Sequence, residues 1–367
     1  MRAGIFLVVL SAGMAAAQQP GADQLLKSAI AEQERGDFQS AIRDYRKVVE
    51  LRPNEVEAKV NLGAALVHVG QFDEGIAMYR SALPSLAFKN PVLLDIGLAY
   101  YKKGDLAKAR DQFATVNKAQ PRNARVAILL GDTDVRLQQP NDALAVLEPL
   151  SAENSENPDF EYVYGSALIA AGRKRDGVPH IEKVAQRQNS ADAYLLAGAT
   201  NLQLDDFEPA RRDLETALRL NPKLPNVYTL VGEARDKTGA AQEAEPAFRE
   251  ALKINPNDFE ANLYLGAILY KRRDTEEART YLDKALALNP KDQMARYQSA
   301  LLKGTSGEYE TAAQTLEQLV KDNPDWLEPH VELANLYYKL HRPQDGARER
   351  EVVDRLTAEQ QSQGPRK

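Results

Sequence analysis

The chain has 367 residues, of which 27% are charged and 43% hydrophobic, an ordinary balance for a soluble protein. Its formal net charge is −6 and it has no run of basic residues, so a nucleic-acid backbone is not an expected partner. The absence of cysteine excludes structural disulfides and a thiol nucleophile.

The first 17 residues differ in kind from the rest. Met1-Arg2 is a short positive start, an apolar run follows at 5–10, and Ala15-Ala16-Ala17 precedes Gln18. This order predicts a secretory signal peptide over residues 1–17, cleaved near Ala17. The alternative is a membrane anchor, but the apolar run is short for about 30 Å of hydrocarbon. We expect a bacterial protein that is periplasmic or secreted.

A two-helix unit is clearest in residues 259–290. Leu265, Gly266 and Leu269 follow Asn262 at i, i+3, i+4 and i+7, which predicts one face of a helix. A second helix with its own apolar stripe follows and ends at the closing proline. Neither helix buries its stripe alone, so each pair must pack on its neighbours.

Small residues and prolines repeat with this unit. Four prolines are spaced 34, 34 and 34 apart: Pro222, Pro256, Pro290 and Pro324. Glycines recur at one place in the first helix of the unit: Gly63, Gly97, Gly131, Gly165, Gly198, Gly232 and Gly266. Alanines recur at one place in the second helix: Ala41, Ala109, Ala143, Ala210, Ala244, Ala278 and Ala312. We interpret both sets as positions where two helices cross closely, because a large side chain would overpack the contact.

A period of 34 with leucine–glycine, alanine, phenylalanine and proline marks resembles the tetratricopeptide repeat family. One unit carries Ile96-Gly97, Tyr100, Ala109, Phe113 and Pro121. The family's opening tryptophan is missing from every unit. The resemblance implies an all-α, right-handed superhelical solenoid of about ten helix-turn-helix repeats over residues 18–358, and we expect residues 359–367 to be a disordered tail. The expected repeats start near residues 22, 56, 90, 124, 158, 191, 225, 259, 293 and 327.

The middle of the array is irregular. Pro149 lies late in a second helix, a polar connection covers residues 151–158, and Gly172, Gly177 and Pro179 crowd the next pair. The step from the fifth repeat to the sixth is one residue short. Because proline and glycine are common causes of kinks, we expect a bend or a softer interface within residues 145–190.

No catalytic, cofactor or metal-binding constellation emerges from the residues. The four histidines lie in three separate regions without a ligand-spaced pair, and the glycines follow the repeat rather than a phosphate-binding loop. The acidic pairs lie at turns and helix starts, where acidic residues cap helices. We therefore expect neither an enzyme nor a cofactor.

In the resembled family, the first helices line a concave wall that contacts peptides or partner helices. By position, the peptide groove here is expected to include Leu98, Tyr101, Ile128, Tyr162, Leu263, Tyr270, Tyr297, Leu301 and Tyr338. Thr229, Glu233 and Asp236 interrupt this apolar wall with an acidic patch. The alternative interpretation is that many of these side chains pack between adjacent first helices and expose only their edges.

These observations favour a non-enzymatic scaffold that binds a protein or peptide, as exported proteins of the family do in envelope assembly or export. Two other classes remain open. One is a self-assembling structural protein, which would be a homo-oligomer, and the other is an accessory subunit of an envelope enzyme complex. No segment after the signal peptide is expected to cross a membrane.

Overall fold

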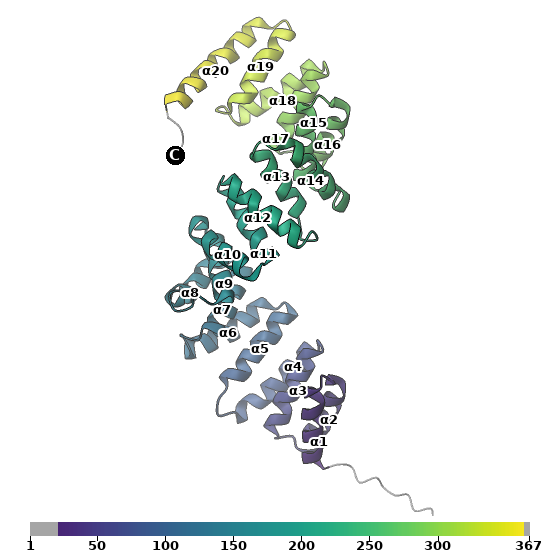
Figure 1. Ribbon diagram of the computed structural model, residues 1–367, viewed down its shortest axis with the longest axis vertical. Coiled ribbons are helices and arrows are strands. Elements are labelled where there is room, and N and C mark those ends of the chain that lie inside the picture. Colours follow the sequence, from purple (N-terminus) through teal and green to yellow (C-terminus); the bar gives the residue numbers. More distant parts are fainter. Residues whose placement is uncertain (1–20, 363–367) are drawn as a thin grey trace, which may run out of the picture. The chain divides into compact units, whose positions relative to one another are not determined.

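A computed structural model describes residues 21–362, and within that range the regular secondary structure is all helical, without strands (Figure 1). The chain divides into two compact units after Gly172. The helices of the first unit are α1 (Ala22–Glu34), α2 (Phe38–Leu51), α3 (Val56–His68), α4 (Phe72–Ala82), η1 (Leu83–Ser85), α5 (Asn90–Lys103), α6 (Leu106–Ala119), α7 (Ala124–Arg136), α8 (Pro140–Leu147), η2 (Glu148–Leu150) and α9 (Pro158–Ala170).

The second unit begins at Arg173 and continues the alternation of first and second helices. Its helices are α10 (Lys174–Gln188), α11 (Ala191–Gln203), α12 (Phe207–Leu220), α13 (Val227–Lys237), α14 (Ala241–Ile254), α15 (Phe259–Lys271), α16 (Thr275–Leu288), α17 (Gln293–Thr305), α18 (Tyr309–Asp322), α19 (Leu327–Lys339) and α20 (Pro343–Ser362). Within each unit, consecutive helices pack against one another in sequence order.

The helix boundaries follow the expected repeat frame closely. The first helices of nine repeats begin at the residue that the period predicts, and only α13 differs, because it begins at Val227 rather than Pro225. Local caps contribute to this agreement, since Asp258 and Asp292 accept hydrogen bonds from backbone N–H groups three residues later.

The turn between the two helices of a repeat uses one left-handed residue. This residue is glycine at Gly36, Gly70 and Gly104, with φ near 82–85°. Two later repeats place Asp205 (φ 60°) and Arg273 (φ 69°) at the same position. Glycine has no Cβ penalty in this conformation, whereas an L side chain costs about 1–2 kcal/mol there.

The helical glycines let the two helices of a repeat approach, but their neighbours differ from the expected small residues. A Cβ on Gly97 would lie 2.5 Å from Phe113, and one on Gly266 would lie 2.7 Å from Leu282. The glycine thus contacts a large side chain that lies one turn after the recurring alanine of the second helix. Leu282, for example, lies one turn after the fully buried Ala278. The small residue of the first helix compensates a large residue of the second.

Several irregular features lie in or beside residues 145–190. Helix α8 is short and passes into η2, and Pro179 lies inside α10. Asn189 ends α10 in the left-handed region (φ 50°), and Ser190 caps α11 directly afterwards, which accounts for the repeat that is one residue short. The division between the compact units falls in this region.

The predicted signal peptide and the predicted disordered tail lie at the two ends of the chain. The predicted signal peptide, residues 1–17, lies outside the described residues. Helix α20 extends to Ser362, so residues 359–362 are helical where we expected the disordered tail to begin. Between residues 21 and 362, no helix combines the length and apolar character needed to cross a membrane.

Candidate functional site

In each unit, the candidate site is a surface of the first helices, and we call these surfaces the first-helix wall. It consists of the residues four, eight and eleven positions after the start of each repeat. In the first unit, the expected groove residues Leu98 and Tyr101 lie on α5, Ile128 on α7 and Tyr162 on α9, and all four are half-buried. Leu98 and Tyr101 pack against the apolar cluster between α5 and its neighbours, and Ile128 packs against the next cluster. Each side chain therefore combines a packed part with an accessible edge.

Tyr101 uses its polar end to connect two repeats. Its hydroxyl donates to Asp132 on α7, and Arg136 Nε donates to the same carboxylate over 2.9 Å. The Arg136 guanidinium also lies 5.3 Å from the centre of the Tyr101 ring. Burial, followed by the hydrogen bond to Asp132, raises the pKa of Tyr101 to about 12. The hydroxyl is thus committed to the neighbouring helix, which leaves the ring edge for a partner.

In the second unit, the expected groove residues differ in how much of each side chain is exposed. Leu263 on α15 is only 6% exposed and belongs to the apolar core, so it offers almost no surface to a partner. Tyr270 on the same helix is half-buried, and its hydroxyl lies 3.0 Å from Thr305 Oγ1 on α17. Leu263 therefore fits the alternative interpretation, in which a residue of the expected groove packs between adjacent first helices.

Tyr297 and Leu301 extend the wall along α17, and both are half-buried. The Tyr297 ring centre lies 5.2 Å from that of Trp326, the residue before α19, and burial raises the pKa of Tyr297 to about 12. This aromatic pair was not expected from the sequence. The sequence feature that could have predicted the pair is the chain's only tryptophan, which directly precedes a first helix.

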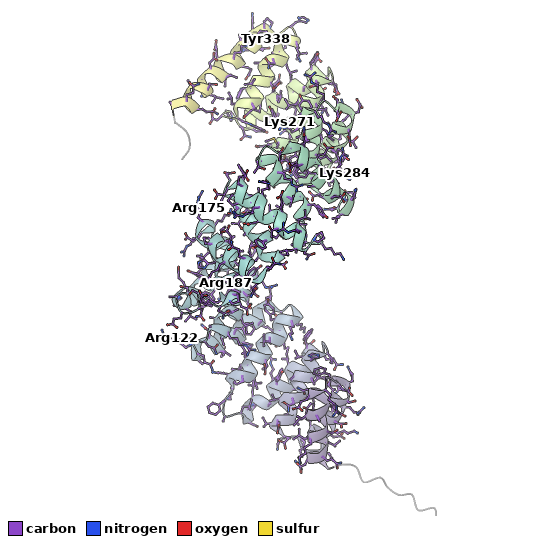
Figure 2. The ribbon with its side chains drawn as sticks, viewed as in Figure 1. Arg122, Arg175, Arg187, Lys271, Lys284 and Tyr338 are labelled. Carbon is purple, nitrogen blue, oxygen red and sulfur yellow. The ribbon has the colours of Figure 1, made fainter. Side chains whose placement is uncertain are left out.

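Tyr338 lies in the last repeat, on α19 (Figure 2). It is 37% exposed, and its ring faces Arg350 of α20, whose guanidinium carbon lies 4.5 Å from the ring centre. A Cβ on Gly346 would lie 2.8 Å from the same ring. Because no further repeat follows α20 in the described chain, Tyr338 packs on that helix and not on another first helix.

The acidic interruption on α13 is hydrogen-bonded to the next repeat. The Thr229 hydroxyl donates to Asp258 Oδ2 over 2.6 Å, and Tyr264 donates to Glu233 Oε1 over 3.4 Å. Burial raises the pKa of the Glu233 carboxyl. These contacts again join one first helix to the next, here α13 to α15.

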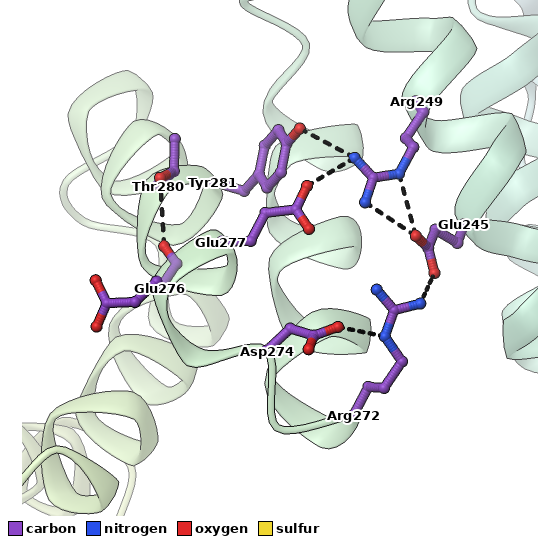
Figure 3. Close-up of polar contacts among 8 residues, drawn as sticks. All are labelled: Glu245, Arg249, Arg272, Asp274, Glu276, Glu277, Thr280 and Tyr281. Carbon is purple, nitrogen blue, oxygen red and sulfur yellow. Dashed lines mark hydrogen bonds and ion pairs between the residues drawn. The ribbon is translucent and has the colours of Figure 1, made fainter.

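A polar network that sequence reasoning missed joins α14, the turn after α15, and α16 (Figure 3). Arg249 on α14 donates to Glu245 Oε1 over 2.9 Å and to Glu277 Oε1 of α16 over 2.7 Å, and Glu277 raises its pKa most strongly. Arg272 donates to Glu245 Oε2 over 2.6 Å and contacts Asp274. The available signal was an arginine followed 28 residues later by an acid, which also occurs for Arg46 and Glu74.

The described residues do not assemble a metal-binding cluster. Between residues 21 and 362, no three His, Cys, Asp or Glu side chains gather in a way that could hold a metal ion. His330 is buried, with Nδ1 2.6 Å from Glu349 and Nε2 3.0 Å from the Pro324 carbonyl. These contacts give His330 a structural role between α19 and α20.

Known proteins share parts of this sequence and fold. The chain is 30% identical over 113 residues to the Arabidopsis thaliana protein CTR9 homolog; the match covers 30% of this chain and a tenth of that protein. Among solved structures, MamA residues 41-end from Desulfovibrio magneticus RS-1 shows 25% identity over 46% of this chain and 96% of that chain, with a TM-score of 0.41. YrrB, described as a tetratricopeptide repeat protein with an unusual peptide-binding site, shows 23% identity over 52% of this chain and 97% of that chain, with a TM-score of 0.44.

Family profiles account for most of the chain. One tetratricopeptide repeat profile matches residues 26–89, 94–133, 128–193 and 195–259. Two further profiles of the same description match residues 237–303 and 294–325. Proteins built from this repeat are generally non-enzymatic scaffolds that bind proteins or peptides. With helix pairs, packing glycines and profile matches in agreement, the chain belongs to the tetratricopeptide repeat family.

Proposed function

We propose that this protein is a non-enzymatic scaffold that binds a peptide or partner protein along the first-helix wall. The observation that carries the proposal is the set of half-buried aromatic rings on that wall, above all Tyr101, Tyr270 and Tyr297. Their polar or aromatic contacts to the next repeat hold each ring in place. A ring held in this way loses little conformational entropy on binding, which favours contact with a partner.

We further propose that the partner belongs to an envelope assembly or export pathway and that the protein acts in the periplasm or outside the cell. The support is the signal-peptide pattern of residues 1–17. The net charge of −6 supports a protein partner over a nucleic acid.

Affinity capture from a cell-envelope extract tests the function. The bait is residues 18–367, compared with a Tyr270→Ala, Tyr297→Ala variant of the wall and with Tyr309→Ala, which changes a half-buried tyrosine on second helix α18. Helicity of each bait is checked by circular dichroism.

We expect a partner that the parent and Tyr309→Ala retain and the wall variant loses. Equal retention by all three baits would refute binding along this part of the wall. A mass that grows with concentration, without a captured partner, would instead favour the self-assembling alternative.

A further inference from the structure

The seventh repeat begins differently from the two repeats after it. In those repeats, Asp258 Oδ1 accepts from the Ala261 N–H over 2.9 Å and Asp292 Oδ1 accepts from the Ala295 N–H over 2.8 Å. The residue 34 positions before Asp258 is Leu224, which has no oxygen to accept this bond and is buried instead. The first turn of this repeat therefore lacks the cap that its neighbours use.

The following residues delay the helix further. Pro225 is followed by Asn226, which takes a left-handed conformation with φ 56°. Helix α13 consequently begins at Val227 and has 11 residues, compared with 13 in α15. A loop replaces the start of the first turn.

This loop lines a cavity of about 340 Å³ in the second unit. Its walls come from residues 222–229 and from the end of α14, and Pro222, Leu224, Tyr228 and Ile254 make much of it apolar. Ile254 is 69% exposed, whereas Leu288, at the same position one repeat later, is 37% exposed. The late start of α13 thus coincides with an accessible apolar space.

Two charged residues, Lys223 and Asp258, lie in the cavity wall, and the Asp258 carboxylate already has partners. Asp258 Oδ1 caps α15, and its Oδ2 accepts from the buried Thr229 hydroxyl over 2.6 Å. A guest therefore does not need to supply a cation or a hydrogen-bond donor to this carboxylate. This arrangement suits an apolar group, because burying an unmatched polar group would cost free energy.

The volume of the cavity limits the size of the group that it can bind. A cavity of about 150 Å³ holds benzene, and pockets for small molecules begin near 300 Å³. The space of about 340 Å³ therefore accommodates one large aromatic side chain. We propose that this cavity binds an aromatic side chain presented by a partner polypeptide, which adds an anchor point separate from Tyr270 and Tyr297. The inference rests on the proposed function only in taking the guest to be part of a protein.

Calorimetric titration of residues 18–367 with N-acetyl-tryptophanamide tests the site without a natural partner. We expect saturable binding at one site with a Kd of about 0.1–1 mM, and binding of N-acetyl-leucinamide about tenfold weaker. Ile254→Glu places a charge at the rim and is expected to weaken binding about tenfold. Leu288→Glu is the matched control and should leave the Kd within about twofold of the parent.

A second variant tests the origin of the cavity. Leu224→Asp, Pro225→Phe and Asn226→Glu together copy residues 258–260, which begin α15. We expect this variant to gain helicity and to lose binding, because the restored first turn removes the loop.

Several results would overturn the inference. They are no saturation by the parent up to about 10 mM probe, equal affinity for the leucine probe, equal loss in both glutamate variants, or parent-like binding by the helix-restored variant. These results leave the capture experiment unaffected, since that experiment depends on Tyr270 and Tyr297 and not on this cavity.

Discussion

Gly266→Ala tests whether the first helix of a repeat must carry glycine where it meets the second. The added Cβ would lie 2.7 Å from Leu282 Cγ and 3.2 Å from the Leu282 backbone nitrogen. Leu282 is fully buried, so its side chain has little room to move away. Helices α15 and α16 must shift apart, at a cost of about 1–3 kcal/mol for overpacking. The higher helix propensity of alanine offsets about 1 kcal/mol, and we expect a net loss of up to about 2 kcal/mol.

Gly304→Ala is a control on α17, at a glycine that lies four residues further along its repeat than Gly266. Its Cβ would lie 3.3 Å from the end of the Leu336 side chain and 3.9 Å from Ala312 Cβ, without a close backbone atom. A small movement of one methyl group accommodates this contact. We expect a net gain of about 0.5 kcal/mol, because the propensity gain exceeds the small packing cost.

Hydrogen exchange of residues 18–367 measures both effects locally. In a repeat array, a change in one repeat alters the opening free energy mainly there and in adjacent repeats. Protection should therefore fall in α15 and α16 for Gly266→Ala and rise in α17 and α18 for Gly304→Ala, while α1 stays unchanged. Equal or higher protection of α15 in Gly266→Ala would refute the packing argument.

Four further expectations follow from other parts of the molecule. Burial raises the pKa of the Asp213 carboxyl from 3.8 to about 6. The stability that this group contributes is therefore present below pH 4 and lost as the pH rises through 6. In urea unfolding, the free energy of Asp213→Asn should consequently rise by up to roughly 3 kcal/mol relative to that of the parent between pH 4 and 7.5. A difference between the two proteins that does not change with pH would contradict this. Arg249→Met removes partly exposed ion pairs and should cost about 1 kcal/mol, with a smaller difference from the parent in 1 M salt. Arg273→Gly relieves a left-handed residue and should stabilise the protein by about 0.5 kcal/mol in thermal or urea unfolding. Residues 145–190 should exchange amide hydrogens faster than residues 225–290, and equal protection would exclude a softer interface there.

Local sequence accounts for most helix boundaries. Asp258 and Asp292 bond to amides only three residues away, so the signal for these helix starts lies within one turn. The 34-residue period then places the other first helices, and α13 departs from it where Leu224 replaces the capping aspartate. The repeat family and the helical class follow from these short-range patterns.

The candidate site depended on contacts between repeats. Leu263 and Tyr270 occupy the same helix and both match the wall pattern, but Leu263 is enclosed by side chains of neighbouring repeats and Tyr270 retains an exposed edge. Tyr101 meets Asp132 across 31 residues of sequence, and the cavity beside Ile254 joins a loop to the end of another helix. A helical period specifies which residues share a face, but the exposure of each residue depends on side chains that only the folded array brings together.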